Sequence, residues 1–161
     1  MFRILAASVF ALLLMPAPSE GAGVQTGAAT RAEVQAFVKT YVDAVNKGDI
    51  SGTMEMYSRK AGVTSVEDGE ISRGWDAIRT GADELVGKEG SYKISIGSID
   101  VVPLGASYAL VVAPYTITVG VGDTVVQAPS AMTMVLEKSG SKWTIIHDHM
   151  STKAAEEQTG D

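Results

Sequence analysis

The spacing of apolar residues changes from helical in the first half of the sequence to alternating in the second half. This order of helices followed by strands constrains the fold more than any other feature. Behind the capping-box sequence of residues 30–33, apolar residues recur at helical spacing from Val34 to Val45. From Ser91 to Ser151 the chain instead alternates as successive strands separated by glycine-containing turns. This order predicts an α+β fold, with N-terminal helices packed on a strongly curved mixed or antiparallel β-sheet. A sheet curved around helices encloses a pocket, which predicts a cone-shaped domain.

Local signals place the remaining elements. The expected elements are a short helix capped by Asp49, a hairpin of residues 63–67 and 70–73 joined by Asp68-Gly69, a third helix after Gly74, a strand over 91–102 with a β-bulge just past Gly97, a long hairpin of 106–119 and 124–137, and a closing strand over 142–151. The Asp-Gly pair supplies the positive φ angles of a two-residue turn. We therefore expect one domain over residues 30–152.

The N-terminus resembles a secretory signal peptide. Arg3 precedes an apolar run over residues 4–15, and Pro16 to Gly21 then interrupts it. The run is shorter than the roughly 20 residues that span a bilayer, so we expect a signal peptide over residues 1–21. This predicts a periplasmic or secreted protein that leaves the membrane after cleavage. A flexible lead over residues 22–29 and a disordered tail over 153–161 complete the expected organisation.

The charge balance excludes some classes of partner. The chain has 13 Lys and Arg against 19 Asp and Glu, and loss of Arg3 and Glu20 with the signal leaves 12 against 18, a net charge of −6. This excess of acid argues against nucleic acid and anionic membranes as partners. Because the chain has no cysteine, the exported domain must be stable without disulfides.

Three stretches carry a family resemblance. Residues 40–49 (TYVDAVNKGD), 72–79 (SRGWDAIR) and 143–151 (WTIIHDHMS) resemble the nuclear transport factor 2-like and SnoaL-like superfamily. The last stretch is similar to closing strands of SnoaL-like domains and of the association domain of calcium/calmodulin-dependent protein kinase II. The resemblance implies the cone-shaped fold with its pocket. It leaves the activity open, because this fold hosts isomerases, dehydratases, hydrolases, oligomerisation domains and binding proteins.

The ketosteroid isomerase branch gives the sharpest comparison. Its chemistry uses a tyrosine and a protonated aspartic acid to hold an oxyanion while another carboxylate moves the proton. Tyr41 matches the tyrosine, but an ungapped count places Ser65 at the base and Thr133 at the oxyanion aspartate. Glu67 shares a strand face with Ser65 and could replace it only in a different hairpin register. We therefore expect no steroid isomerisation.

The closing strand requires a choice of inward face. The isomerase-like register points Thr144, Ile146, Asp148 and Met150 into the pocket, which makes Asp148 a carboxylate in an apolar cavity. Burial would raise its pKa and suit it to acid or base catalysis. The alternative is a structural carboxylate that pairs with an arginine or a backbone amide at the cavity mouth.

The opposite face of that strand predicts a homodimer. Trp143, Ile145, His147 and His149 share the outward parity, and such apolar patches mark partner surfaces. The two histidines could reach one metal ion, but the chain offers no further histidine and no cysteine. We therefore expect no metal site, and no other cofactor.

These observations combine into one leading hypothesis. We expect a small, mostly apolar ligand in the pocket, with Asp148 as acid or base and Tyr41 as hydrogen-bond donor, in an isomerase, cyclase or dehydratase type of reaction. The other expected lining residues are Tyr57, Ser65, Trp75, Thr133, Ile146 and Met150. The helix aromatics could equally be core. The alternative function is a non-catalytic dimerisation or ligand-binding module.

Overall fold

The computed structural model describes residues 20–87, 91–121 and 124–153. The expected signal peptide lies outside these residues except for its last two positions, and so does the expected tail beyond Lys153. Both remain predictions. Within the described residues, none of the helices combines the length and the apolar character needed to cross a membrane.

Three helices precede the long strands. They are α1 (Glu20–Asn46), α2 (Ile50–Glu55) and α3 (Trp75–Gly87). The expected start of the first helix at Thr30 is wrong, since residues 22–29 continue α1 instead of forming a separate lead. This segment contains no proline and three alanines, and alanine is the best helix former.

Caps and glycines set the other helix ends, as the sequence predicts. The Asp49 side chain accepts a hydrogen bond from the N–H of Gly52 at 2.9 Å, which caps α2. Gly48 ends the preceding turn with a φ of 66°, and Gly74 precedes α3 with a φ of 86°. Both angles lie in the left-handed region that glycine adopts without steric cost.

The strands form one curved mixed sheet, which confirms the α+β prediction. The strands are β1 (Thr64–Glu67), β2 (Glu70–Arg73), β3 (Ser91–Ile96), β4 (Asp100–Pro103), β5 (Tyr108–Val121), β6 (Thr124–Ser139) and β7 (Lys142–Thr152). Their order is β2-β1-β7-β6-β5-β3, with β4 also on β5. The β1–β7 pair is parallel and all other pairs are antiparallel. The Asp68-Gly69 turn has the predicted positive φ angles of 46° and 95°.

The expected single strand over residues 91–102 is wrong. It divides into β3 and β4, which pair with successive parts of β5. At the division, the N–H of Gly97 donates to the carbonyl of Pro114 at 2.8 Å. A Cβ on Gly97 would lie 3.2 Å from Pro114, so only glycine fits this close approach without displacing its neighbour.

The closing strand β7 contains a β-bulge at Ile146. Leu136 of β6 pairs with Ile145 of β7, but Val135 pairs with His147, so Ile146 has no partner. Trp143 and Ile145 before the bulge and Asp148 and Met150 after it are all buried. The uniform parity expected for this strand is therefore wrong, and Trp143 and Ile145 belong to the core and not to the outer face.

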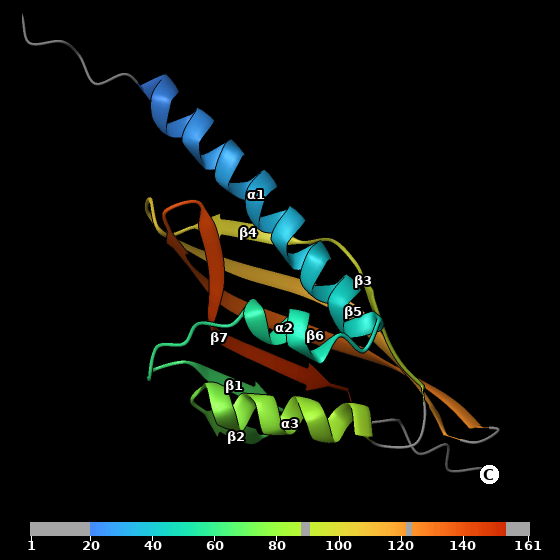
Figure 1. Ribbon diagram of the computed structural model, residues 1–161. Coiled ribbons are helices and arrows are strands. Elements are labelled where there is room, and N and C mark those ends of the chain that lie inside the picture. The colour runs from blue at the N-terminus through green and yellow to red at the C-terminus, as the bar shows by residue number, and fades with distance from the viewer. Residues whose placement is uncertain (1–19, 88–90, 122–123, 154–161) are drawn as a thin grey trace, which may run out of the picture.

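The helices lie on the concave side of the sheet. Figure 1 shows α1 running beside β3 and β4, with α2 between α1 and α3, and α3 along the β1–β2 hairpin. The core between these layers includes Val38 of α1, Met54 of α2, and Met132, Met134 and Ile145 of the sheet. The cavity lies where the three helices approach the β1–β7 side of the sheet.

Candidate functional site

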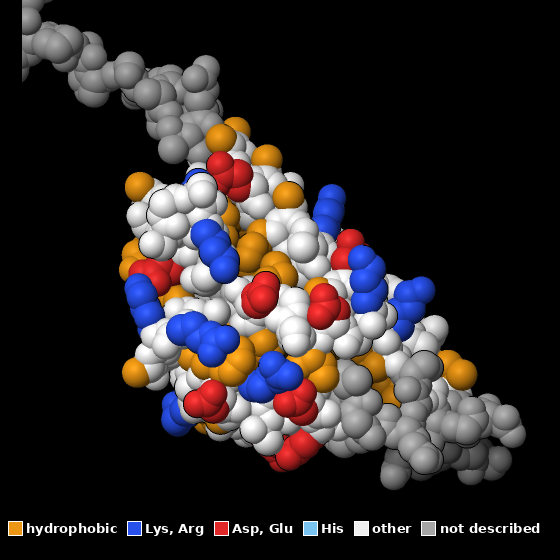
Figure 2. Space-filling view, viewed as in Figure 1, with side chains coloured by type: hydrophobic (Ala, Val, Ile, Leu, Met, Phe, Trp, Pro, Cys, Tyr) orange, Lys and Arg blue, Asp and Glu red, His pale blue; other side chains and the backbone are white. Residues whose placement is uncertain are grey.

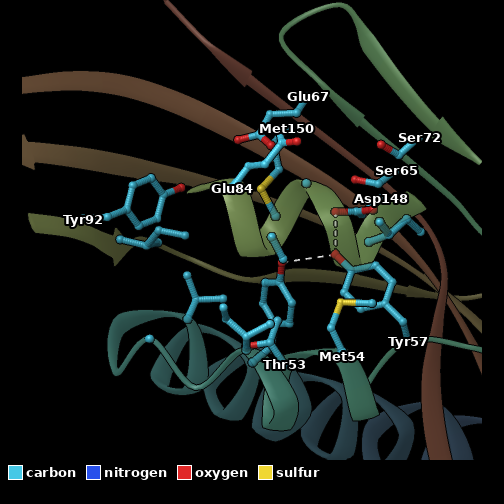
Figure 3. Close-up of a pocket in the computed structure, with 18 of the residues that line it drawn as sticks. Thr53, Met54, Tyr57, Ser65, Glu67, Ser72, Glu84, Tyr92, Asp148 and Met150 are labelled. Atoms are coloured by element: carbon cyan, nitrogen blue, oxygen red, sulfur yellow. Dashed lines mark hydrogen bonds between the residues drawn. The ribbon is translucent and has the colours of Figure 1, made fainter. Parts of the chain in front are cut away.

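A cavity of about 650 Å³ opens between the helices and the sheet. This volume suits a small organic molecule. Its walls come from the end of α1, from α2 and α3, and from β1, β2, β3 and β7 (Figure 3). Apolar and aromatic side chains form much of the interior, among them Tyr41, Met54, Tyr57, Ile78, Ile94 and Met150.

Asp148 is the charged group that the fold places deepest in this cavity. Its side chain faces inward because Asp148 pairs with the buried Met134 of β6, and the parallel pairing sets it opposite Ser65 of β1. The carboxyl is only 1% exposed. Its Oδ1 atom has no hydrogen-bond partner among the described residues, although the cavity lies beside it. A buried carboxyl oxygen without a partner is costly, so this atom is available to a ligand.

Tyr57 holds the other oxygen of this carboxyl. Its backbone is fixed beside β7, because Ser58 N–H donates to the Ile145 carbonyl and Ile145 N–H donates to the Met56 carbonyl, both at 2.9 Å. From there the Tyr57 hydroxyl donates to Asp148 Oδ2 at 3.0 Å (Figure 3).

Tyr41 extends this contact into a chain of three groups. The hydroxyls of Tyr41 and Tyr57 are 3.3 Å apart, and their rings meet edge to face with centroids 6.2 Å apart. Because the single Tyr57 proton is used on Asp148, Tyr41 is the donor in the Tyr41–Tyr57 contact. The direction of donation is therefore Tyr41 to Tyr57 to Asp148.

Burial raises the pKa values of Asp148, Tyr57 and Tyr41. Burial raises the pKa of Asp148 from 3.8 to about 6; the Ser65 and Tyr57 hydroxyls lower it, and the charge of Glu67 raises it. Burial and the nearby Asp148 charge raise the pKa values of Tyr41 and Tyr57 well above 10. Both tyrosines therefore stay protonated at neutral pH, while Asp148 can gain or lose its proton there.

Five of the expected site residues lie at the cavity wall. Tyr41, Tyr57, Ser65, Asp148 and Met150 all line the cavity. Tyr41 lies at the far end of the hydrogen-bond chain and donates to Tyr57. In this arrangement its hydroxyl proton is not available to a ligand, which differs from the donor role expected for it.

Three expected lining residues lie elsewhere. Trp75 packs outside the cavity, where its Nε1 donates to the Met54 carbonyl at 3.0 Å and the Arg59 guanidinium lies 3.4 Å from its ring centroid. Thr133 lies between the fully buried Met132 and Met134, so it faces the outer side of the sheet. Ile146 is the bulge residue and is not part of the cavity wall.

Several lining residues were not anticipated. Asn46 clamps the end of α1 to the edge of the sheet: its Oδ1 accepts from Ile94 N–H at 2.7 Å and its Nδ2 donates to the Ile94 carbonyl at 2.8 Å. Glu84 of α3 and Tyr92 of β3 also line the cavity. The helical spacing of Ile78 and Ala82 could have indicated the inward side of α3, but not that a carboxylate would lie at its margin.

The outward histidines form no metal site that the structure supports. His147 Nδ1 is hydrogen-bonded to the Thr64 hydroxyl at 2.8 Å, and His149 is exposed. Among the described residues, no three histidine or acidic side chains are placed to hold one metal ion.

Comparison with protein-family models identifies the family. The model described as SnoaL-like domain matches residues 34–155, most of the chain. The chain belongs to the SnoaL-like domain family. No curated protein matches it at a significant level.

Solved structures share the fold of this SnoaL-like domain. A nuclear transport factor 2-like protein from Salmonella enterica superposes with a TM-score of 0.71 at 16% identity, over 83% of this chain and 99% of that one. A candidate dehydratase of the same superfamily from Streptomyces avermitilis gives 0.69 at 18% identity, over 77% and 96%. A candidate calcium/calmodulin-dependent protein kinase II association domain from Xanthomonas campestris gives 0.64 at 22% identity, over 75% and 86%. These likenesses concern the fold alone.

Proposed function

We propose that this SnoaL-like domain binds a small molecule with an apolar body in its cavity and that Asp148 transfers a proton on that molecule. The observation that carries the proposal is the unpartnered Oδ1 of a carboxyl that is 1% exposed and lies at the cavity wall. Its raised pKa of about 6 places the change of protonation close to the working pH, where general acids and bases are most efficient.

The proposed step is a proton transfer next to a carbonyl. Asp148 Oδ1 takes a proton from the carbon beside a ligand carbonyl; the electron pair of that C–H bond forms a C=C bond to the carbonyl carbon, and the C=O π pair moves to the oxygen, which gives an enolate. The oxygen then reforms its C=O bond in one of two ways. In an isomerisation, the protonated carboxyl returns the proton to a different, conjugated carbon of the enolate. In a dehydration, the carboxyl gives the proton to a hydroxyl on the neighbouring carbon, whose C–O bond breaks as a new C=C bond forms, and water leaves. Tyr57 keeps Oδ2 occupied throughout, so that Oδ1 is the reacting oxygen, and Tyr41 orients Tyr57.

The candidate dehydratase among the structural relatives is consistent with this reaction type.

The experiment begins with the ligand itself: the purified protein is denatured and extracted, and the released small molecules are identified by mass spectrometry. Turnover of the identified compound is then compared between the wild type and Asp148→Asn, with Asp100→Asn as a control that lies outside the cavity. Loss of turnover with retained binding in Asp148→Asn alone supports the proposal. Equal turnover in all three proteins refutes it.

A non-catalytic binding module is the second candidate. The hydroxyls of Tyr41 and Tyr57 already donate within the protein, so neither is free to hold a developing oxyanion. If the identified ligand binds the wild type and is recovered unchanged after prolonged incubation, the binding module is the correct function.

We also propose that the domain is exported. The apolar run over residues 4–15 behind Arg3 supports this, together with the Pro16 to Gly21 stretch that follows. Intact-mass measurement of protein recovered from the periplasm or culture medium tests it, because a retained Met1 contradicts cleavage.

A further inference from the structure

The cavity wall is strongly acidic. Five of its described lining residues carry carboxyl groups, and Lys47 is the one basic residue among them. The carboxyl groups belong to Glu67, Asp68, Glu70, Glu84 and Asp148. The first four are exposed and form what we call the acidic rim, whereas Asp148 is buried. Three of these carboxyl groups belong to the β1–β2 hairpin, and the fold brings Glu84 of α3 and Asp148 of β7 to the same cavity. On the face seen in Figure 2, by contrast, acidic and basic side chains are interspersed.

This negative charge acts within the cavity. The charge of Glu67 raises the pKa values of Asp148, Tyr41 and Tyr92, which lie on different sides of the pocket. A concave wall with carboxylates of one sign concentrates the field in the hollow and attracts positive ligands. An anionic ligand would be repelled by the same groups.

The unpartnered Asp148 oxygen gives the second, independent indication. Oδ1 is an acceptor when the carboxyl is ionised, and its burial makes ionisation costly without a partner. A ligand N–H with a positive charge would satisfy the hydrogen bond and compensate the charge together, as a charge-assisted hydrogen bond does. A neutral ligand could satisfy only the hydrogen bond.

The cavity fits an organic cation better than a metal ion. Among the described side chains, no three acidic groups or histidines approach one another closely enough to hold a metal. The cavity of about 650 Å³ is much larger than a metal site, and its apolar residues require an apolar body against them.

We propose that the cavity selects an organic cation, an amine whose ammonium group faces Asp148 and the acidic rim while its apolar body packs against Tyr41, Met54 and Ile94. This proposal rests on the proposed function, since it names the class of molecule that the same cavity takes. It shares the cavity with the proposed function but not the proton transfer, because an ammonium group that occupies Oδ1 leaves this oxygen unable to take a proton from carbon. Binding of an organic cation at Asp148 therefore favours the binding module.

Three probes with one apolar cage and different charges test this selection. They are adamantan-1-amine, which is cationic, adamantan-1-ol, which is neutral, and adamantane-1-carboxylate, which is anionic at pH 7.5. Calorimetry or NMR chemical-shift titration on the whole protein gives each dissociation constant, at low salt and at 0.5 M NaCl. We expect the amine to bind about tenfold more tightly than the alcohol, and the carboxylate most weakly. The amine's advantage should shrink at high salt, because the rim carboxylates are exposed and screened.

A charge-matched pair of variants assigns the effect to the rim. Glu70→Gln/Glu84→Gln removes two lining carboxylates, and Asp43→Asn/Asp100→Asn removes two exposed ones that do not line the cavity. The first variant should weaken amine binding by about 2- to 10-fold and leave alcohol binding unchanged, and the second should change neither.

The outcomes separate the two proposals. Equal binding of the three probes, or tightest binding of the carboxylate, overturns the cation proposal and leaves the binding cavity in place. An equal loss of amine affinity in both double variants also overturns it, since the effect would then be one of net charge. Failure of all three probes to bind, in a protein that is folded by circular dichroism, overturns the cation proposal together with the cavity as a site for compact apolar ligands.

Discussion

Replacing Asp148 by asparagine should stabilise the protein at alkaline pH. The folded structure raises the pKa of this carboxyl from 3.8 to about 6, so ionisation is less favourable in the folded than in the unfolded protein. That difference corresponds to ~3 kcal/mol of unfolding free energy above pH 6. Asparagine has no charge to bury and keeps an acceptor for the Tyr57 hydroxyl. We expect a gain of about 1–3 kcal/mol at pH 8, since some of the difference is offset by imperfect fit of the amide.

The pH dependence follows from the raised pKa. Between about pH 4 and pH 6 the folded wild type holds a proton on Asp148 that the unfolded chain has lost, so the stability of the wild type falls as pH rises through this window. The advantage of Asp148→Asn should therefore be largest above pH 6 and disappear towards pH 4.

Urea unfolding followed by circular dichroism at several pH values between 4.5 and 8 measures this difference. A gain of 2 kcal/mol shifts the midpoint by about 1 M at the slopes usual for small domains. Asp100→Asn, on the exposed part of β4, serves as the control and should show no such trend. A variant that is less stable than the wild type by more than ~1 kcal/mol at pH 8, or a difference that is constant with pH, refutes the account of a costly buried charge.

Three further predictions follow from the same structure. Tyr57→Phe removes a hydrogen bond that lowers the pKa of Asp148, so an NMR titration of that carboxyl should give a value above the wild-type one; an unchanged or lower value would contradict the contact. The wild type should not isomerise an unsaturated ketosteroid in a spectrophotometric assay, because Ser65 stands at the expected base position, and Ser65→Asp should be assayed beside it; robust wild-type turnover would show that another carboxylate reaches the substrate. The protein should be a homodimer by light scattering at micromolar concentration, since Val102 and Val112 leave apolar surface exposed on the sheet, and Val112→Glu should give a monomer; a monomeric wild type would count against it.

Local signals in the sequence predicted the parts of the fold that depend on near neighbours. The Asp49 cap, the Asp68-Gly69 turn and the order of helices and strands all follow from residues close together in the chain. Asp148 also lines the cavity, although its inward side was inferred from a register that holds for only half of the strand.

The errors arose where packing decides between equivalent local patterns. In the run Trp143-Thr144-Ile145-Ile146, two adjacent isoleucines suit either face, so the sequence carries no mark of the bulge that reverses the parity there. Trp143 was assigned outward for that reason. Thr133 was assigned inward by an ungapped count along the chain, which cannot detect which residues of β6 face the helices.

The sequence could not predict the acidic rim, for a different reason. Glu70 and Glu84 belong to a hairpin and a helix whose relative placement depends on tertiary packing, and each looks like an ordinary exposed acid in the sequence. They share one cavity margin because α3 lies along the β1–β2 hairpin.

The single extra residue in β7 means that the chemistry of the cavity does not depend on the exact length of this strand. Deleting Ile146 would leave the pairs Leu136–Ile145 and Met134–Asp148 in place as part of a regular ladder. Asp148 would still face the cavity, because directly opposed residues share one face of the sheet. The strand would lose only the local bend and the added twist that a bulge gives it. A change of one residue in length at this position therefore acts on the curvature of the sheet and leaves the carboxyl group where it is.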